Sequence, residues 1–376
     1  SDVCSSDLIV IALQFDAANP FIGKVAVVEK EKKAYAIDST GRILSPGFDQ
    51  LVPMNDTVFF IYLNEVSDSL GGWGVVNING TTIIPPAYDE VGSLGLDNYI
   101  FRKDTLWGAV SRHGDLITEA KYDTIISFYG NYLFVRSGKY VGVLDKKGNM
   151  LVPLEYTRLT MPNKLVFAAY NDKVSYDRPK GWGGLDLTGN LMIPFGFDSI
   201  FGVGNVFVAV WEKDSMGCYF PLANGNPTPV IYTSINTKGR FWVELKTKKK
   251  LCGLADTVGN MIIPAEYKEI IPGGYNIWFV RNDKNLWGFY NSAGTKLLDP
   301  KYNFIQPFSS DVTIVNSGNL TGLVNNRGEE LVKPALQQII IRGNTVKIIR
   351  SDSSATFPRS EEHTSELQSP YVISYA

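Results

Sequence analysis

The sequence contains very few of the residues that most often carry enzyme chemistry. It has two histidines and three cysteines among 376 residues. Two of these five, Cys4 and His363, fall in terminal segments that are set apart below, which leaves His113, Cys218 and Cys252. One histidine without a cysteine cluster cannot assemble a zinc site or a nucleophile–base–acid triad. We therefore predict no catalytic residue, no metal and no cofactor, and we do not expect an enzyme.

The sequence also lacks long apolar runs and an excess of either charge. No apolar stretch approaches the ~18 residues that a membrane-spanning helix needs. Between residues 9 and 358 there are 35 basic and 33 acidic residues, with the signs mixed. This balance argues against an electrostatic surface for nucleic acid or for a membrane. We expect no nucleic-acid partner and no membrane span in this fragment.

Both ends of the chain resemble translated sequencing-library adapter. Residues 1–8 (SDVCSSDL) and the segment from Arg359 (RSEEHTS) can be encoded by one oligonucleotide read in opposite directions. We assign residues 1–8 and 359–376 to adapter, residues 9–350 to the structural array and residues 351–358 to the end of the genuine insert. Because that insert is open at both ends, the localisation stays unassigned. Deletion of both adapter segments is expected to leave folding unchanged.

A period of about 35 residues dominates the remaining chain. An aromatic–glycine pair recurs, and a turn glycine follows six residues later in all copies but one. The pair glycines are Gly74, Gly108, Gly142, Gly183, Gly217, Gly253, Gly288 and Gly322. The exceptional turn glycine is Gly225, in an enlarged loop. We count about nine repeats, and the first is a degenerate copy near Tyr35–Ala36.

Each repeat has the pattern of short β-strands. The apolar stretch 73–77 predicts one strand, and the glycine after it tolerates the positive φ of a hairpin turn. The returning strand is cut short by proline, and a third strand such as 132–137 precedes the next pair. A Tyr-Asp-x-Ile segment is expected to link the repeats. Because no stretch has helical periodicity, we predict an all-β array of three-stranded repeats, propeller-like or superhelical.

The pair itself is interpreted as structural. A glycine without Cβ allows a neighbouring backbone or ring to approach closely. Trp73, Trp107, Trp182 and Trp287 share one position with apolar substitutes in other copies. That tolerance predicts tryptophans that pack in the core. Cys218 and Cys252 occupy buried-type positions beside pair glycines, and a bridge between neighbouring repeats is left open.

The pattern W-G-x5-G-x7-[YF]-[DN] resembles the WG repeat, a β-repeat of bacterial proteins. The resemblance covers residues 25–338 and is weakest where the pair is lost, at Tyr35–Ala36 and Thr321–Gly322. It implies a bacterial source and a binding or interaction role. It brings no catalytic residues.

Candidate ligand-stacking residues lie outside the pair. Trp211, Trp242 and Trp278 occupy outer strands of consecutive repeats, at spacings of 31 and 36 residues. On a shared face they would form a platform for a sugar ring or for a partner's apolar side chain. The alternative is that they pack between repeats. The run KTKKK at 246–250 is expected to be a solvated hairpin tip that can make a local anionic contact.

Acidic residues offer the remaining route to catalysis, because paired carboxylates hydrolyse glycosides. Asp89, Asp123 and Asp198 recur directly after the closing aromatic, and Asp145 and Asp186 precede turns. Recurrence in many repeats favours a structural role, in which the carboxylates accept backbone N–H groups. The leading prediction is a non-enzymatic scaffold for a protein or cell-envelope partner. A glycan-binding module is the alternative, followed by a hydrolase.

Overall fold

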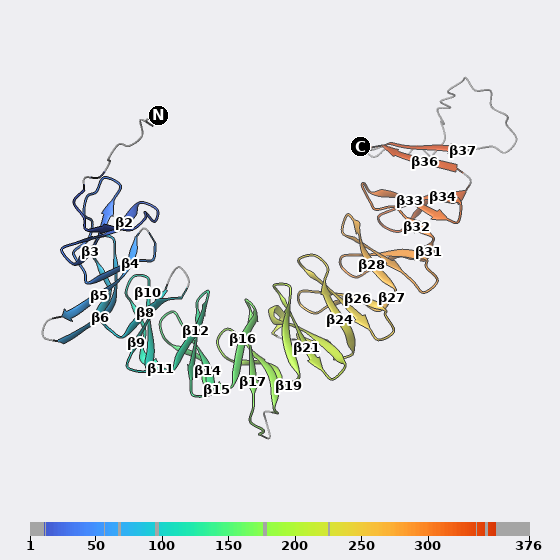
Figure 1. The fold of residues 1–376 in the computed structure, drawn as a ribbon. Helices are drawn as coiled ribbons and strands as arrows, with labels where there is room; N and C mark the ends of the chain where they lie inside the picture. The colour runs from blue at the N-terminus through green and yellow to red at the C-terminus, as the bar shows by residue number, and fades with distance from the viewer. Residues whose placement is uncertain are drawn as a thin grey trace, which may run out of the picture. The chain divides into compact units, whose positions relative to one another are not determined.

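The computed structural model describes residues 11–350, apart from residues 12, 56, 67–68, 95–97, 176–178, 225, 336 and 343–344. The two adapter-like segments, residues 351–358 and Gly225 therefore lie outside the described residues. The chain divides into an N-terminal part, residues 1–159 with 169–172, and a C-terminal part, residues 160–168 with 173–376. Each part is a series of small antiparallel sheets (Figure 1).

The predicted all-β repeat array is confirmed. In strand order, the sheets of the N-terminal part are β1 (Ala17–Ala18), β2 (Val25–Lys30) and β3 (Lys33–Asp38); β4 (Gln50–Pro53), β5 (Val58–Val66), β6 (Ser69–Asn77) and β7 (Thr82–Tyr88); β8 (Glu90–Ser93), β9 (Asn98–Lys103), β10 (Leu106–Ser111) and β11 (Leu116–Tyr122); and β12 (Thr124–Tyr129), β13 (Tyr132–Ser137), β14 (Tyr140–Asp145) and β15 (Met150–Tyr156). A further sheet, whose residues are divided between the two parts, comprises β16 (Arg158–Asn163), β17 (Val166–Asn171), β18 (Gly181–Leu185) and β19 (Leu191–Phe197).

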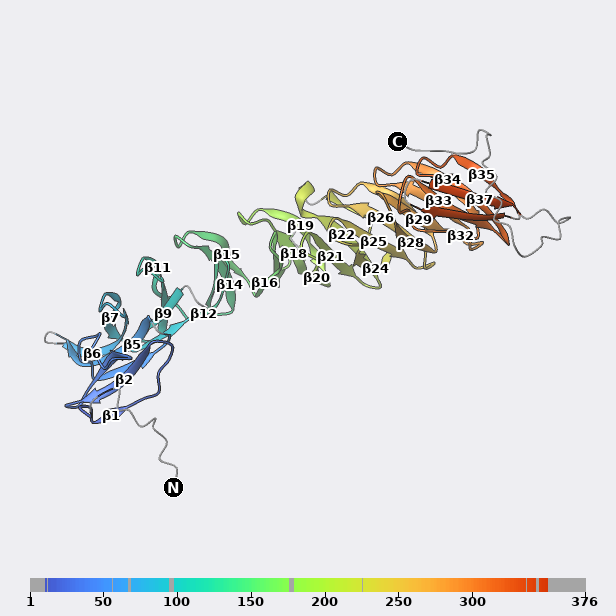
Figure 2. The ribbon, with the colours of Figure 1, turned by 90° about the horizontal axis from the view of Figure 1, so that it is seen from above.

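The C-terminal part continues the same pattern, and Figure 2 shows its sheets stacked one behind the next. Its strands are β20 (Ser199–Val203), β21 (Phe207–Glu212), β22 (Ser215–Phe220), β23 (Asn226–Pro227), β24 (Tyr232–Thr237), β25 (Trp242–Thr247), β26 (Cys252–Asp256) and β27 (Met261–Tyr267) in one sheet; β28 (Glu269–Gly274), β29 (Ile277–Arg281), β30 (Trp287–Asn291) and β31 (Lys296–Tyr302); β32 (Phe304–Ile305), β33 (Val312–Ser317), β34 (Leu320–Asn325) and β35 (Glu330–Ala335); and β36 (Gln337–Arg342) with β37 (Thr345–Arg350). The larger sheet joins two repeats through the pairing of Met216 with Tyr232, and a 3₁₀ turn spans Pro221–Ala223.

A complete repeat has four strands, where the sequence predicts three. The additional strand is the expected link: Glu90–Ser93 pairs with the following strand from Glu90↔Arg102 to Ser93↔Tyr99. It was missed because its short, glycine-containing sequence has no clear alternation of apolar and polar residues. We call the four strands of each repeat A to D in chain order. Four antiparallel strands are also the composition of a propeller blade.

The pair glycine lies opposite a bulge in strand D. Trp73 pairs with Tyr88 and Val75 pairs with Ile84, so strand D contains extra residues opposite Gly74. A Cβ added at Gly74 would lie 2.6 Å from the Ile84 carbonyl oxygen. The predicted close approach is therefore confirmed, and the approaching group is the bulged backbone of the same sheet.

The first repeat follows the same rule in a shifted register. The bridge Ala34↔Phe48 corresponds to Trp73↔Tyr88, so Ala34–Tyr35 stands at the pair position, one residue before the expected Tyr35–Ala36. Tyr35 takes the place of the pair glycine, and Gly47 on the facing segment makes room for its ring. The repeats of the sequence did not reveal this shift, because Ala34 and Tyr35 are neither the tryptophan nor the glycine that mark the pair in other repeats.

The apolar core lies between successive sheets. Ala109, Ile117 and Leu133 are buried together between β8–β11 and β12–β15, and Phe279, Phe289 and Val315 are buried together between β28–β31 and β32–β35. Each buried aliphatic or aromatic side chain contributes about 1.5–3 kcal/mol. A repeat therefore gains its core from its neighbours, as expected for a repeat array.

Candidate binding edges

The alternation of strands gives each repeat two chemically different edges. The B–C hairpin and the D–A junction lie at one end of the strands, which we call the tip edge. The A–B and C–D turns lie at the other end, which we call the turn edge. In β8–β11, for example, Lys103 pairs with Leu106 at the tip edge, while Tyr99 pairs with Val110 at the turn edge.

The recurring acids are structural parts of the tip edge. The residue between strands D and A accepts the backbone N–H of the residue fifteen positions later, at the tip of the next B–C hairpin. The pairs are Asp16 with Glu31 (2.9 Å), Asp49 with Asn64 (2.7 Å), Asp89 with Asp104 (2.6 Å), Asp123 with Gly138 (2.6 Å), Asp198 with Lys213 (2.7 Å) and Asn303 with Gly318 (2.6 Å). The predicted structural role is confirmed, although the donor is a distant hairpin instead of a local turn.

The acids before the turn glycines also serve the backbone, as predicted. Asp145 Oδ1 accepts the N–H groups of Lys147 and Asn149, both at 2.8 Å. Asp186 Oδ1 does the same for Thr188 and Asn190, both at 2.9 Å. Burial opposes ionisation of Asp186, but these hydrogen bonds outweigh it and leave its pKa below the ordinary value. These carboxylates are therefore already satisfied by their own turns.

The three candidate aromatic residues do not form one exposed platform. Trp278 is buried, with 7 % exposed, and its ring meets that of Trp242 edge-on at 5.7 Å between centroids. Trp242 is half-buried against the same cluster as Trp278. Trp211 is half-buried against a different cluster, around Phe207 and Met216. The structure thus brings Trp242 and Trp278 together, in the arrangement that the inter-repeat alternative predicts.

The four tryptophans of the pair are half-buried, and cations partly cover two of them. The Arg102 guanidinium lies 5.9 Å from the centre of the Trp107 ring, and Arg281 lies 5.5 Å from that of Trp287. Glu90 and Glu269 on strand A hold these arginines, at 3.1 and 2.6 Å. The exposed ring face is thus occupied by an internal cation–π contact.

Large hydrophobic side chains are exposed mainly at the turn edge, a surface that the sequence analysis did not single out. In the N-terminal part they are Phe21, Ile22, Ile43, Leu116, Tyr129 and Met150. In the C-terminal part they are Leu191, Leu222, Phe241, Val258, Met261 and Tyr275. Most of them lie in turns or begin strand D. Equivalent positions in successive repeats would have revealed the pattern if the turns had been aligned with one another.

The turn edge is continuous within the C-terminal part. The turn glycine Gly259 packs on the Phe220 ring of the preceding repeat, and Gly294 faces the Ile262 carbonyl. In the A–B turns, Tyr275 Oη donates to the Ser309 carbonyl at 3.1 Å. The exposed Leu222, Val258 and Met261 are therefore parts of adjoining C–D turns, and Tyr275 belongs to the row of A–B turns.

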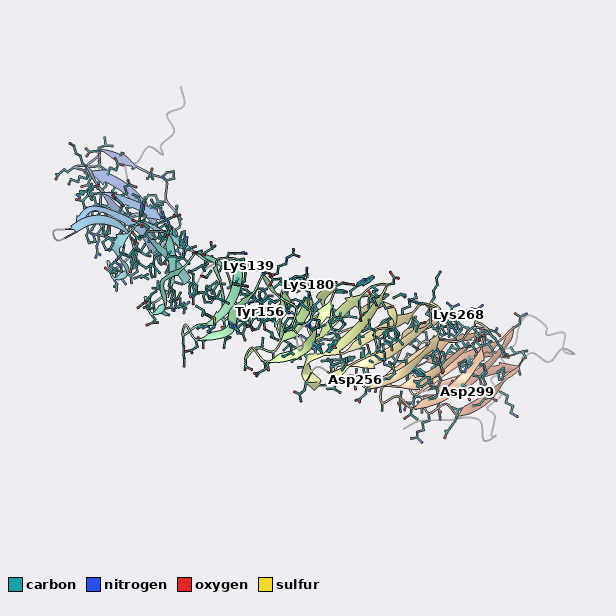
Figure 3. All side chains as sticks on the ribbon, turned by 90° about the horizontal axis from the view of Figure 1, so that it is seen from below. Lys139, Tyr156, Lys180, Asp256, Lys268 and Asp299 are labelled. Carbon is teal, nitrogen blue, oxygen red and sulfur yellow. The ribbon has the colours of Figure 1, made fainter. Side chains whose placement is uncertain are left out.

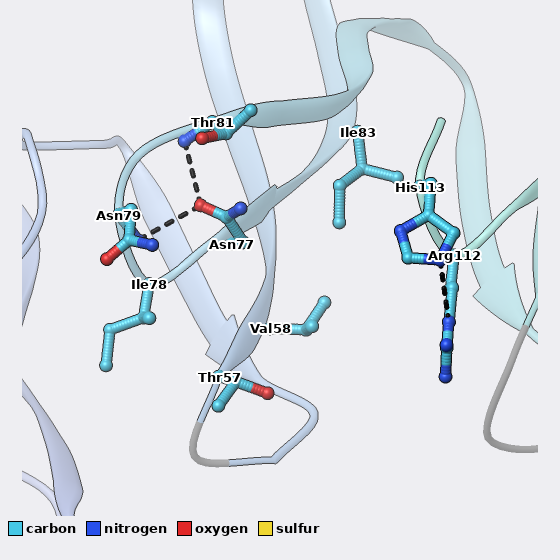
Figure 4. A pocket seen from close by; sticks show the side chains of 9 residues that line it. All are labelled: Thr57, Val58, Asn77, Ile78, Asn79, Thr81, Ile83, Arg112 and His113. Carbon is cyan, nitrogen blue, oxygen red and sulfur yellow. Dashed lines mark hydrogen bonds between the residues drawn. The ribbon is translucent and has the colours of Figure 1, made fainter. Parts of the chain in front are cut away.

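A hollow of about 460 Å³ opens on the turn edge of the N-terminal part (Figure 4). Arg112 and His113 line one side, and Asn77, Asn79 and Thr81 line the other. Arg112 Nε donates to His113 Nε2 at 2.9 Å, so the imidazole nitrogen that a general base would use is occupied. His113 is exposed in a turn, as predicted.

The remaining chemistry-bearing groups are separated. Cys218 and Cys252 are free thiols buried in two different clusters, so the inter-repeat bridge is not formed. Burial raises the pKa of Cys218 to about 12. Across the described ranges, no three His, Cys, Asp or Glu side chains gather as a metal site. No helix in that portion of the chain is long and apolar enough to cross a membrane.

These features define an all-β repeat protein. Five segments match the family model for the WG containing repeat: residues 9–33, 73–101, 107–140, 253–284 and 287–320. The resemblance to the WG repeat is therefore confirmed in these five segments. A comparison with curated proteins gave no match.

Solved structures share only a loose likeness. A eukaryotic initiation factor is 9 % identical with a TM-score of 0.28, over 86 % of this chain and 89 % of that one. BamB from Moraxella catarrhalis is 14 % identical with a TM-score of 0.23, over 60 % and 79 %. The computationally designed Ika8 protein is 12 % identical with a TM-score of 0.21, over 91 % and 96 %. At these TM-scores the superpositions transfer neither an arrangement nor a function.

Proposed function

We propose that this chain is a non-enzymatic scaffold that binds a partner protein along the turn edge. The exposed hydrophobic side chains of the turn edge are the observation that carries the proposal. Contiguous apolar surface, especially with aromatic residues, is typical of protein-interaction sites. Phe241 is 60 % exposed and Tyr275 is 56 % exposed, so a partner that covers these rings gains the free energy of burying them.

The alternative functions have less support. A hydrolase needs two free carboxylates in one cleft, whereas the recurring acids accept backbone N–H groups. A glycan platform needs exposed ring faces, whereas Trp278 is buried and Trp242 packs against its edge. Binding of a partner protein through turns that differ between repeats requires neither free carboxylates nor exposed ring faces.

The test compares two pairs of exposed hydrophobic residues at opposite ends of the strands. Leu222→Ser with Met261→Gln alters the turn edge, and Ile231→Ser with Phe304→Ser is the matched control at the tip edge. All four side chains are about half exposed, between 43 % and 54 %. Both variants should therefore keep the far-ultraviolet circular dichroism spectrum of the parent.

The variants are immobilised and exposed to an extract of the source cells, and captured proteins are quantified by mass spectrometry. The most enriched protein is then purified and its affinity is measured by calorimetry. We expect at least a tenfold loss of affinity for the turn-edge variant and no change for the control, since interface hot spots each contribute 2 kcal/mol or more. Equal affinity of both variants, or binding of a glycan array in place of a protein, would contradict the proposal.

A further inference from the structure

Charge is unevenly distributed between the two edges of the C-terminal part. Six lysines gather on the tips of hairpins β25–β26 and β29–β30 and on the junction between them. This lysine cluster consists of Lys246, Lys248, Lys249, Lys250, Lys268 and Lys284. In Figure 3, Lys268 lies on one edge of the C-terminal part and Asp256 on the opposite edge.

Backbone geometry fixes the cluster at the surface. The Lys250 N–H donates to the Thr247 carbonyl at 2.8 Å, and Lys250 adopts a φ of +62°. This tight turn places Lys248, Lys249 and Lys250 at an exposed tip. Three successive cations at one tip repel one another, so their retention there is not explained by the stability of the hairpin.

Lys268 joins the two hairpins into one surface. It stands at the D–A junction, where five other repeats have an aspartate and others have threonine or asparagine. Its Nζ donates to the Asp283 carbonyl at 2.7 Å, in the β29–β30 tip, and its own carbonyl lies 3.7 Å from Cys252 Sγ, directly after the β25–β26 tip. A position that is anionic in five repeats therefore adds a cation here.

Few anions offset the cluster. The carboxylates on the same hairpins and junction are Glu244, Asp256, Glu269 and Asp283. Asp256 lies at the turn edge, and Glu244 is paired with Lys238 at 3.1 Å. Glu269 is already paired with Arg281 at 2.6 Å. The near balance of charge over the whole chain is thus compatible with a local excess of positive charge at these tips, where the run KTKKK was expected to allow an anionic contact.

We propose that the lysine cluster docks on a membrane surface rich in anionic lipid headgroups. Lysine is a hydrated point charge that needs only a surface of opposite charge, and four to eight cations suffice for adhesion to anionic lipids. Base-specific recognition relies on arginine forks and stacking rings, but Arg281 is held by Glu269 and covers Trp287. Docking by the tip edge leaves the turn edge of the same sheets facing away from the lipid.

The test uses sedimentation with vesicles of phosphatidylcholine alone or with about one-third phosphatidylglycerol. The parent is expected to bind only the anionic vesicles, and to be released at high salt. The variant K248Q/K249Q/K250Q should lose partitioning on the order of 100-fold at low salt, because each lysine near an anionic surface contributes about fivefold. The matched control K146Q/K147Q/K164Q removes the same charge from exposed lysines of the turn edge and should bind like the parent.

Three results would overturn the inference. The first is failure of the parent to bind anionic vesicles at low salt. The second is an equal loss for the control, which would make net charge the cause. The third is tighter binding of the parent to poly-glutamate or to a DNA duplex than to the vesicles, which would assign the cluster to another class of partner.

Discussion

The contact between neighbouring repeats at the turn glycine can be tested by a matched pair of substitutions within one sheet. Gly148 ends the β14–β15 turn with a φ of +81°, and Gly130 lies in the β12–β13 turn with a φ of +61°. An alanine at either site must adopt a left-handed conformation. The two sites differ in their surroundings, because a Cβ at Gly148 would overlap the Ile117 carbonyl oxygen of the preceding repeat, whereas a Cβ at Gly130 would have no atom within 4 Å.

The expected magnitudes follow from these two terms. The left-handed conformation costs an alanine about 1–2 kcal/mol at both positions. At Gly148 the overlap adds roughly 1–3 kcal/mol, because the obstructing atom is backbone and cannot rotate away. Gly148→Ala is therefore expected to destabilise the protein by about 2–5 kcal/mol, and Gly130→Ala by about 1–2 kcal/mol.

Hydrogen exchange is the appropriate assay, because a repeat array need not unfold in a single step. Gly148→Ala should accelerate exchange of amides in both β11 and β15, on the two sides of the contact. Gly130→Ala should affect only its own turn. If both variants gave the same stability and the same exchange pattern, the inter-repeat contact would contribute nothing beyond backbone conformation, and our account of the turn glycine would be wrong.

Three further predictions concern the hydrogen bonds and thiols. Asp123→Ala should lower the free energy of unfolding by about 1 kcal/mol and accelerate hydrogen exchange of the Gly138 amide. An unchanged exchange rate of that amide would contradict this prediction. The hydrogen bond from Tyr302 lowers the pKa of Glu330, so this group contributes stability above its unfolded pKa that is lost as pH falls; Glu330→Gln should flatten the acid side of a stability–pH curve. Native Cys218 should resist Ellman's reagent at pH 8 until unfolding, and rapid labelling would refute its burial.

Sequence reasoning succeeded where one residue type has one physical use. The turn glycines were predictable because only glycine readily adopts their positive φ, which is +76° at Gly80 and +92° at Gly259. The pair glycine was predictable for a different reason, since the bulged backbone opposite Gly74 leaves no room for a Cβ. The buried position of Trp278 was left open, because a strand sequence does not say which face meets the neighbouring sheet.

Features that depend on contacts between residues distant in the sequence were not predictable. The bond from Asp123 to the Gly138 amide joins residues fifteen positions apart, and nothing local distinguishes it from a bond to a nearby turn. Strand A was missed for a similar reason, since its pairing and not its composition makes it a strand. The run KTKKK at 246–250 was predicted as a solvated tip, but the addition of Lys268 and Lys284 was not, because the tip edge draws together residues that are distant in sequence.

The two edges differ because the frame constrains them differently. At the tip edge, the D–A junction must supply a group that holds the next hairpin, so this position is polar whether it carries Asp123, Asn303 or Lys268. At the turn edge, the residue two positions after the turn glycine is exposed, and only in some repeats, as with Glu330 and Tyr302, does its side chain bind a neighbouring strand. It is Leu116 in one repeat and Lys296 in another. Binding specificity is therefore expected to vary through this position, because its side chain can change without loss of the fold.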